Sequence, residues 1–219
     1  MFVARRMKKK IVTAAPSASL FEAQCQMREH TIRQLPVVSE DGTLLGIVSD
    51  RDIRAAVLPA GLVPGFTAGE AEKFMKSTPV ERVMTRKVVT ATLTDTLEDA
   101  IVLLRDFRVN ALPVVDGAGK VAGIITRTDV LEAFIDALGV GEVSSRLEVL
   151  VPDRPGMLAQ LAAIIGSFHV NITSVVSIRH EDGKRADFLR VATLNVGPIR
   201  KAIEEAGFEI LDPSKFLLS

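Results

Sequence analysis

The sequence has little from which a covalent or metal-bound framework could form. Cys25 is the single cysteine of the 219 residues, and the three histidines are widely separated. This excludes a disulfide framework and a metal site of ordinary ligand spacing, and a lone cysteine fits a reducing cytoplasm. No run of about 18 apolar residues occurs, so the sequence predicts no membrane span.

The chain also has no excess of charge of either sign. Lys and Arg together number 27, as do Asp and Glu, so no net positive field favours nucleic acid as a partner. Apolar side chains make up 47% of the residues, which is enough to supply more than one buried core. We therefore expect a folded chain with one large domain or two modest ones.

One segment occurs twice, at a constant offset of 77 positions and without gaps. Residues 34–53 read QLPVVSEDGTLLGIVSDRDI, and residues 111–130 read ALPVVDGAGKVAGIITRTDV. The same offset pairs Met7 with Met84, which extends the repeat to about 55 residues. Two copies of one supersecondary unit normally pack against each other to complete a shared core.

Each copy is predicted to fold as β-α-β-β-α. A short extended piece comes first, and a helix follows that a capping box opens, Ser19 with Glu22 or Thr96 with Asp99. Two apolar strands joined by a turn come next, LPVV and LLGIVS in the first copy, and a second helix closes the copy. Glycines and prolines from Pro59 onward indicate a loop between the copies, followed by a short helix over 70–77.

The pattern changes after the second copy to strand, helix, strand, strand, helix and strand. This is the ferredoxin-like order βαββαβ. Its strands are predicted over 147–151, 172–180, 186–194 and 208–211, its helices over 155–168 and 199–206, and a turn at Glu181-Asp182-Gly183. The fold class is therefore α/β (α+β). The predicted segments are a first domain over 1–60, a linker with a short helix over 61–79, a second domain over 80–138, a linker over 139–145 and a third domain over 146–213.

In each copy a hydroxyl residue ends the second strand, three positions before an acid. Ser49 precedes Asp52 in this way, and Thr126 precedes Asp129. The hydroxyl and the free N–H groups of the following helix can donate to phosphate oxygens, where the helix dipole also favours negative charge. The acid can accept hydrogen bonds from both ribose hydroxyls, so the pattern indicates a nucleoside phosphate. For either copy alone, a hydroxyl that only caps its helix explains the pattern equally well.

The two copies, each with an LPVV strand ahead of the hydroxyl and the acid, resemble the CBS family over residues 1–138. Tandem pairs of this family form a Bateman module, and each nucleotide cleft combines the hydroxyl and acid of one repeat with the opening strand of the other. The resemblance implies AMP, ADP, ATP or S-adenosylmethionine as a regulatory ligand. It assigns to one cleft Arg33, Gln34, Ser49, Arg51, Asp52, Met84 and Val89. It assigns to the other cleft Met7, Val12, Asn110, Ala111, Thr126, Thr128 and Asp129.

The second cleft departs from the family pattern. Asn110 and Ala111 stand where CBS clefts often carry a basic residue, which predicts that phosphate binds there more weakly or not at all. Neither cleft is expected to offer an aromatic side chain, so adenine would rest on aliphatic side chains and backbone groups.

The third domain opens its first helix with VPDRPGML at residues 151–158. Asp153 is expected to cap this helix, Pro155 to lie in its first turn, and Gly156 to leave room for a ligand carboxylate on the amides. The turn resembles that of the ACT family, in which amino acids bind between paired domains. The resemblance implies an amino-acid site at Asp153, Pro155, Gly156, Met157, Leu158 and Asn171. A capped helix without a ligand, in a domain that serves only as a dimer interface, explains the pattern too.

These motifs leave no residues from which a catalytic site could be built, so we do not expect an enzyme. The order of the domains resembles the AcuB type of regulator, named for acetoin utilisation. We expect a stand-alone sensor that forms a homodimer or higher homo-oligomer, acts on a partner enzyme, and binds neither nucleic acid nor a membrane. The alternative is a ligand-independent adaptor that dimerises and docks on such an enzyme.

Overall fold

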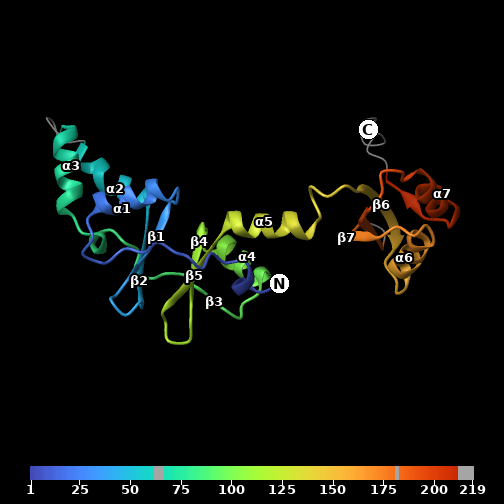
Figure 1. The fold of residues 1–219 in the computed structure, drawn as a ribbon, viewed down its shortest axis with the longest axis horizontal. Coiled ribbons are helices and arrows are strands. Elements are labelled where there is room, and N and C mark those ends of the chain that lie inside the picture. The colour runs from blue at the N-terminus through green and yellow to red at the C-terminus, as the bar shows by residue number, and fades with distance from the viewer. Residues whose placement is uncertain (62–66, 181–182, 212–219) are drawn as a thin grey trace. The chain divides into compact units, whose positions relative to one another are not determined.

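The fold is known from a computed structural model, which describes residues 1–61, 67–180 and 183–211 (Figure 1). The chain divides into an N-terminal unit, Met1–Leu131, and a C-terminal unit, Glu132–Ser219. The described residues contain neither a helix long and apolar enough to cross a membrane nor a group of three His, Cys, Asp or Glu side chains placed to hold a metal ion.

The two copies of the repeat form the N-terminal unit, except that the last helix of the second copy continues past Leu131. The elements of the first copy are α1 (Leu20–Glu29), β1 (Gln34–Val38), β2 (Leu44–Ser49) and α2 (Asp50–Gly61). The elements of the second copy are β3 (Ala91–Thr92), α4 (Leu97–Asp106), β4 (Ala111–Val115), β5 (Val121–Thr126) and α5 (Arg127–Ala137). Strands β1 and β2 form an antiparallel hairpin, as do β4 and β5 in the same register. The predicted opening strand of the first copy is reduced to one parallel bridge, between Ala14 and Val37.

A short segment ahead of each copy packs on the other copy. These segments contain the single-turn helices η1 (Val3–Arg5) and η2 (Val80–Arg82). The backbone hydrogen bonds of this exchange are Val3 N to Asp95 O (2.8 Å), Leu97 N to Met1 O (2.8 Å), Val80 N to Ala18 O (2.8 Å) and Leu20 N to Thr78 O (2.9 Å). The hydrophobic core of the first copy accordingly includes Val80 and Met84 from the chain around η2.

The connection between the copies differs from the prediction in one respect. Helix α2 continues through Pro59, where we expected a loop to begin. A proline late in a helix loses one hydrogen bond, here to the carbonyl of the exposed residue Ala55, which water can satisfy. Pro64 and Gly65 of the predicted loop lie outside the described residues. The predicted short helix is present as α3 (Ala68–Ser77), which packs on α1 and α2.

Beyond the end of α5, the C-terminal unit forms one antiparallel sheet covered by two helices. Its elements are β6 (Ser145–Pro152), α6 (Met157–Ser167), β7 (Ile172–Arg179), β8 (Lys184–Val191), α7 (Gly197–Glu205) and β9 (Glu209–Ile210). The strand order β7-β8-β6-β9 confirms the predicted βαββαβ topology. Strand β8 ends at Val191, before the predicted Leu194, and Glu181 and Asp182 of the predicted turn lie outside the described residues. Side chains of β6, including Leu147, alternate toward α6 and α7, where they form the core.

Candidate functional site

Matched backbone contacts join the two copies. Lys8 and Ile124 exchange two hydrogen bonds of 2.9 and 3.0 Å, and Thr85 and Ile47 exchange two of the same lengths. The offset of 77 relates Lys8 to Thr85 and Ile47 to Ile124. The chain at Thr85 therefore lies beside β2, which ends in Ser49, and the chain at Lys8 lies beside β5 of the other copy.

A cavity of about 1050 Å³ is lined by residues of both copies. The residues assigned to the two nucleotide clefts that line it are Val12, Arg33, Gln34, Ser49, Arg51, Asp52, Val89, Asn110, Ala111, Thr126 and Thr128. The two clefts expected from the sequence thus open into one cavity. Its lining includes no Phe side chain, so the described walls offer a base aliphatic, polar and basic side chains, among them the imidazole of His30.

Three residues assigned to the clefts are not part of this lining. Met84 is 8% exposed and belongs to the core of the first copy. Met7 occupies the matched position, and the sulfur atoms of both methionines lie close against glycines of the facing strands. Asp129 is only 5% exposed. The two methionines therefore position the strands.

The hydroxyl and the acid of each copy are bonded to one another. Ser49 Oγ donates to Asp52 Oδ2 at 2.6 Å, and Asp52 N donates back to Ser49 Oγ at 3.2 Å. Thr126 and Asp129 form the same pair, with distances of 2.6 and 3.2 Å. This is the geometry of a helix cap, so the capping role that the sequence left open is present. Ser49, Asp52 and Thr126 also line the cavity, which makes them available to a ligand.

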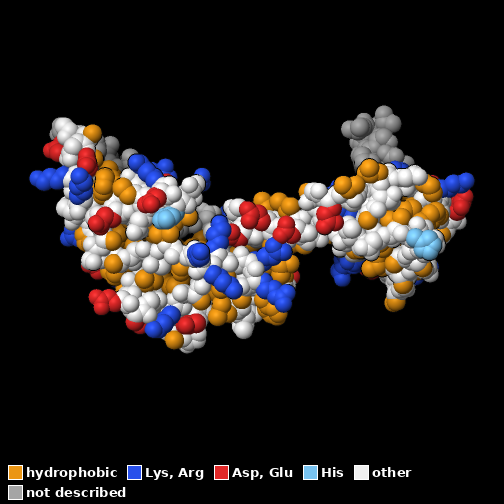
Figure 2. Space-filling view, viewed as in Figure 1, with side chains coloured by type: hydrophobic (Ala, Val, Ile, Leu, Met, Phe, Trp, Pro, Cys, Tyr) orange, Lys and Arg blue, Asp and Glu red, His pale blue; other side chains and the backbone are white. Residues whose placement is uncertain are grey.

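Basic side chains surround the cavity, and sequence reasoning missed several of them. Figure 2 shows Lys and Arg side chains close together on the visible face of the N-terminal unit. Besides Arg33 and Arg51, the basic residues in the lining are Lys8, Lys10, His30, Arg54, Lys87, Arg108 and Arg127. The offset of 77 relates Lys10 to Lys87, so this pair was visible in the sequence, whereas Arg54 and Arg108 were missed. Arg127 donates to the carbonyls of Val109 (2.9 Å) and Leu104 (3.1 Å), so its guanidinium is largely occupied.

The C-terminal unit contains a smaller cavity, of about 270 Å³, at the start of α6. Gly156, Met157 and Leu158 line it, as the sequence indicated, whereas Asp153, Pro155 and Asn171 do not. The prediction that Asp153 caps α6 was wrong. The N-cap is Gly156, with a φ of 93°, a left-handed conformation that only glycine adopts readily. Asp153 lies earlier in the turn, where its N–H donates to Gly183 O at 2.9 Å.

A polar cluster on neighbouring strands completes this smaller cavity and was not predicted. Asp187 is 2% exposed and its Oδ1 accepts a hydrogen bond from Ser177 Oγ at 2.5 Å. Arg185 Nε donates to the same Ser177 Oγ at 2.7 Å, and its Nη1 lies 3.8 Å from Asp153 Oδ1. All three of Ser177, Arg185 and Asp187 line the cavity beside the first amides of α6. The site therefore holds a buried carboxylate, a guanidinium and a helix N-terminus.

Comparison with known protein families agrees with this architecture. The model of the CBS domain matches residues 3–59 and 80–136, which is more than half of the chain. The chain belongs to the CBS domain family. The model of the ACT domain matches residues 145–208, so the C-terminal unit contains an ACT domain.

Relatives of the CBS pair include stand-alone proteins and enzymes. An uncharacterized protein of Methanocaldococcus jannaschii is 36% identical over 155 residues, which cover 62% of this chain and 92% of the relative. The inosine-5'-monophosphate dehydrogenase of Aquifex aeolicus is 32% identical over 122 residues, which cover 55% of this chain but only 22% of the enzyme. The CBS pair thus resembles one segment of that larger protein.

Solved structures of CBS pairs have the same fold. CBSX2 of Arabidopsis thaliana, solved in complex with AMP, has a TM-score of 0.51 and 30% identity, and the match covers 62% of this chain and 96% of that one. The CBS pair of protein MJ0100, solved in complex with 5'-methylthioadenosine and S-adenosyl-L-methionine, has a TM-score of 0.51 and 28% identity. That match covers 61% of this chain and 95% of MJ0100. Adenosyl compounds are therefore ligands of structurally similar CBS pairs.

Proposed function

We propose that this protein is a non-catalytic regulator that binds an adenosyl ligand in its CBS pair. The ligand is AMP, ADP, ATP or S-adenosylmethionine, all of which carry adenine and a ribose diol. One observation carries the proposal: a single cavity of about 1050 Å³ is lined by Ser49 and Asp52, by Thr126, and by basic residues. The ligands of CBSX2 and MJ0100 support the same chemical class.

The first cleft has one group suited to the ribose of the ligand and other groups suited to its phosphate. Asp52 Oδ2 is engaged by Ser49, while Oδ1 accepts no hydrogen bond from the residues that the structure describes. This oxygen is therefore the proposed acceptor for the two ribose hydroxyls. Arg33 and Arg51, both in the lining, supply positive charge for a phosphate next to the N-terminus of α2.

A calorimetric titration with AMP tests the acids directly. We expect the Asp52→Ala, Asp129→Ala double variant to lose binding, because both acceptors for the ribose hydroxyls are removed. The matched control is Asp99→Ala, which loses the acid of a similar capping box, with Thr96, outside the cavity. Undiminished affinity in the double variant would exclude the proposed role of the acids.

A thermal-shift measurement separates the sensor from the ligand-independent adaptor. A ligand that binds only the folded protein raises the melting temperature, by an amount that grows with the ratio of its concentration to its Kd. We expect such a rise with AMP or S-adenosylmethionine at millimolar concentration. An unchanged melting temperature with every adenosyl ligand would favour the adaptor. In either case the regulated activity lies in a partner enzyme, and the resemblance to the AcuB type points to acetoin or related metabolism.

We also propose that the ACT domain binds a small amino acid in the cavity at the start of α6. The buried carboxylate of Asp187 is the proposed partner of the ligand ammonium, and Arg185 with the amides of Met157 and Leu158 is the proposed site of the carboxylate. Titration with the standard amino acids should identify one that binds, and Asp187→Asn should abolish that binding while the shape of the cavity is kept. Binding that survives Asp187→Asn would place the amino acid elsewhere.

A further inference from the structure

The two acids of the CBS pair differ in what surrounds them. Asp129 is 5% exposed, and its Oδ1 lies 3.3 Å from the Nζ atom of Lys8. Asp52 lines the cavity and forms no ion pair with any residue that the structure describes. The acceptor that is open in the first cleft is therefore occupied in the second.

A single side chain accounts for this difference. Lys8 and Thr85 occupy matched positions, and each exchanges two backbone hydrogen bonds with the strand that faces it. The backbone is thus the same at both places. The Lys8 side chain is long enough to reach the acid of its cleft and carries a positive charge, whereas the shorter, neutral side chain of Thr85 forms no such ion pair. The Lys8 side chain is itself 61% exposed and lines the cavity, so it stands between Asp129 and the solvent.

We propose that Lys8 closes the second cleft, so that the wild-type protein binds one adenosyl ligand per chain, at Ser49 and Asp52. This inference rests on the proposed function and determines which cleft performs it. A ribose hydroxyl that enters the second cleft must displace a charge-assisted contact to a buried carboxylate, and such contacts are stronger than those between neutral groups. The first cleft presents Asp52 without this competition.

The residues for phosphate recognition favour the same cleft. Arg33 and Arg51 of the first cleft correspond to Asn110 and Thr128 of the second. Arg127, next to Thr126, is engaged by two backbone carbonyls. At these matched positions the second cleft therefore offers a phosphate fewer free guanidinium groups, and its acid is occupied as well.

Exchange of the two matched residues tests the inference. Lys8→Thr introduces the residue that the other copy carries, and we expect the stoichiometry of AMP or S-adenosylmethionine in calorimetry to rise from one to two per chain. Thr85→Lys transfers the competing ammonium to the first cleft, and we expect the affinity there to fall by about tenfold or more. Both positions are exposed in the folded protein, and circular dichroism checks that the variants fold.

The combined variant Lys8→Thr, Asp52→Ala decides the outcome. Asp52→Ala alone should abolish binding, and the added Lys8→Thr should restore one site, at Asp129. A wild-type stoichiometry of two, or no restored site in the combined variant, would overturn the inference while the proposed function stands. Absence of binding in the wild type and in Lys8→Thr with both ligands would overturn the proposed function and this inference together.

Discussion

At Gly46 the backbones of the two copies lie close together. A methyl group there would lie 2.5 Å from Met84 Sδ and 3.0 Å from the Thr85 carbonyl oxygen. The methionine side chain could move, but the carbonyl belongs to the backbone that is bonded to Ile47. Glycine is therefore required on both sides of the interface, since a methyl group at Gly123 would lie 2.6 Å from Met7 Sδ and 2.9 Å from the Lys8 carbonyl oxygen.

We predict that Gly46→Ala lowers the free energy of unfolding by about 1–3 kcal/mol, the usual cost of overpacking. The control is Gly69→Ala in α3, where the added methyl group meets only an ordinary contact, 3.9 Å from Thr67 Oγ1. Because alanine favours helices, this control should leave stability unchanged or raise it slightly. Urea denaturation measures both, and an equal loss in the two variants would contradict the argument.

Site residues that lie close together in the sequence could be predicted, and those that meet only through the packing of the fold could not. Ser49 and Asp52 were found because their spacing alone places both at the start of one helix. The contact of Lys8 with Asp129 was missed because it joins different copies and depends on how they pack. The burial of Asp187 was missed for a similar reason, since it depends on Ser177 across the sheet.

At the scale of elements, local signals were reliable where one helix turn contains the whole interaction. The capping box of Ser19 with Glu22 was predicted and is present. The expectation for Asp153 was wrong because the cap of α6 depends on a left-handed turn at Gly156, which the Asp-Pro-Gly spacing did not reveal. The βαββαβ order was predictable because it follows from hydrophobic periodicity, whereas the end of α2 beyond Pro59 was not.

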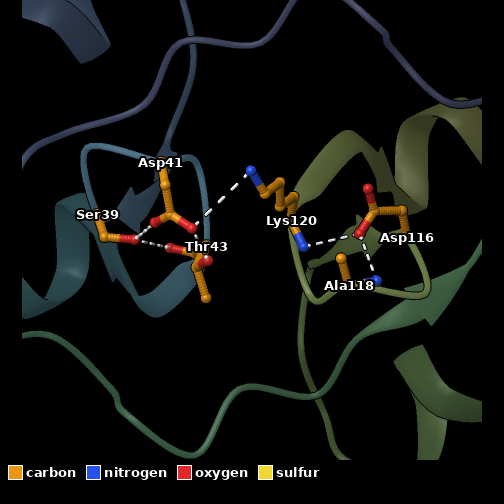
Figure 3. A network of polar contacts seen from close by, with 6 residues as sticks. All are labelled: Ser39, Asp41, Thr43, Asp116, Ala118 and Lys120. Carbon is orange, nitrogen blue, oxygen red and sulfur yellow. Dashed lines mark hydrogen bonds and ion pairs between the residues drawn. The ribbon is translucent and has the colours of Figure 1, made fainter.

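The turns of the two hairpins form another contact between the copies (Figure 3). Leu44 N donates to Gly119 O at 3.1 Å, and the matched Val121 N donates to Gly42 O at 3.0 Å. Within the first turn, Asp41 accepts hydrogen bonds from the hydroxyls of its neighbours on both sides, at 2.6 and 2.8 Å. The hydrogen bond from Ser39, followed by that from Thr43, lowers the pKa of Asp41 to about 2.

This pKa predicts a specific response to acid. The pKa of Asp41 falls to about 2 from its usual 3.8, which means that the folded state stabilises the ionised carboxylate. Its contribution to stability is therefore complete above the unfolded pKa and is lost as the pH falls from about 4 to about 2. We expect Asp41→Asn to melt below the wild type at pH 6, with a small difference that shrinks in this range. A difference between the melting temperatures that is constant from pH 6 to pH 2 would rule out titration of Asp41.

At the scale of the whole molecule, the two copies leave unlike surfaces. Leu131 is 61% exposed and Phe107 is 59% exposed, and the matched residues of the first copy are Arg54 and His30. Helix α3 packs on α1 and α2 of the first copy. Large apolar side chains that remain exposed on one copy favour coverage by a second chain.

We predict that the protein is a homodimer or a higher homo-oligomer at micromolar concentration, as measured by light scattering. Phe107→His with Leu131→Arg gives the second copy the residues of the first, and should weaken self-association by about tenfold or more. The control is Leu194→Arg, at a residue of the ACT domain that is 75% exposed. A monomeric wild type would refute the prediction. If Leu194→Arg weakened self-association equally, Phe107 and Leu131 would have no specific role in it.

The last prediction is that ligands of the two domains influence one another. Helix α5 carries Thr128 and Asp129 in its first turn, and only residues 138–144 separate its end from β6 of the ACT domain. A ligand that alters the start of α5 can therefore bias the chain that leads into the ACT domain. Coupling of this kind is reciprocal and is typically about 1–3 kcal/mol, or roughly 5- to 150-fold in affinity. Its measurement is a pair of titrations, of AMP and of the bound amino acid, each with and without a saturating amount of the other. Equal affinities in both pairs, once each ligand is known to bind, would mean that the two domains act independently.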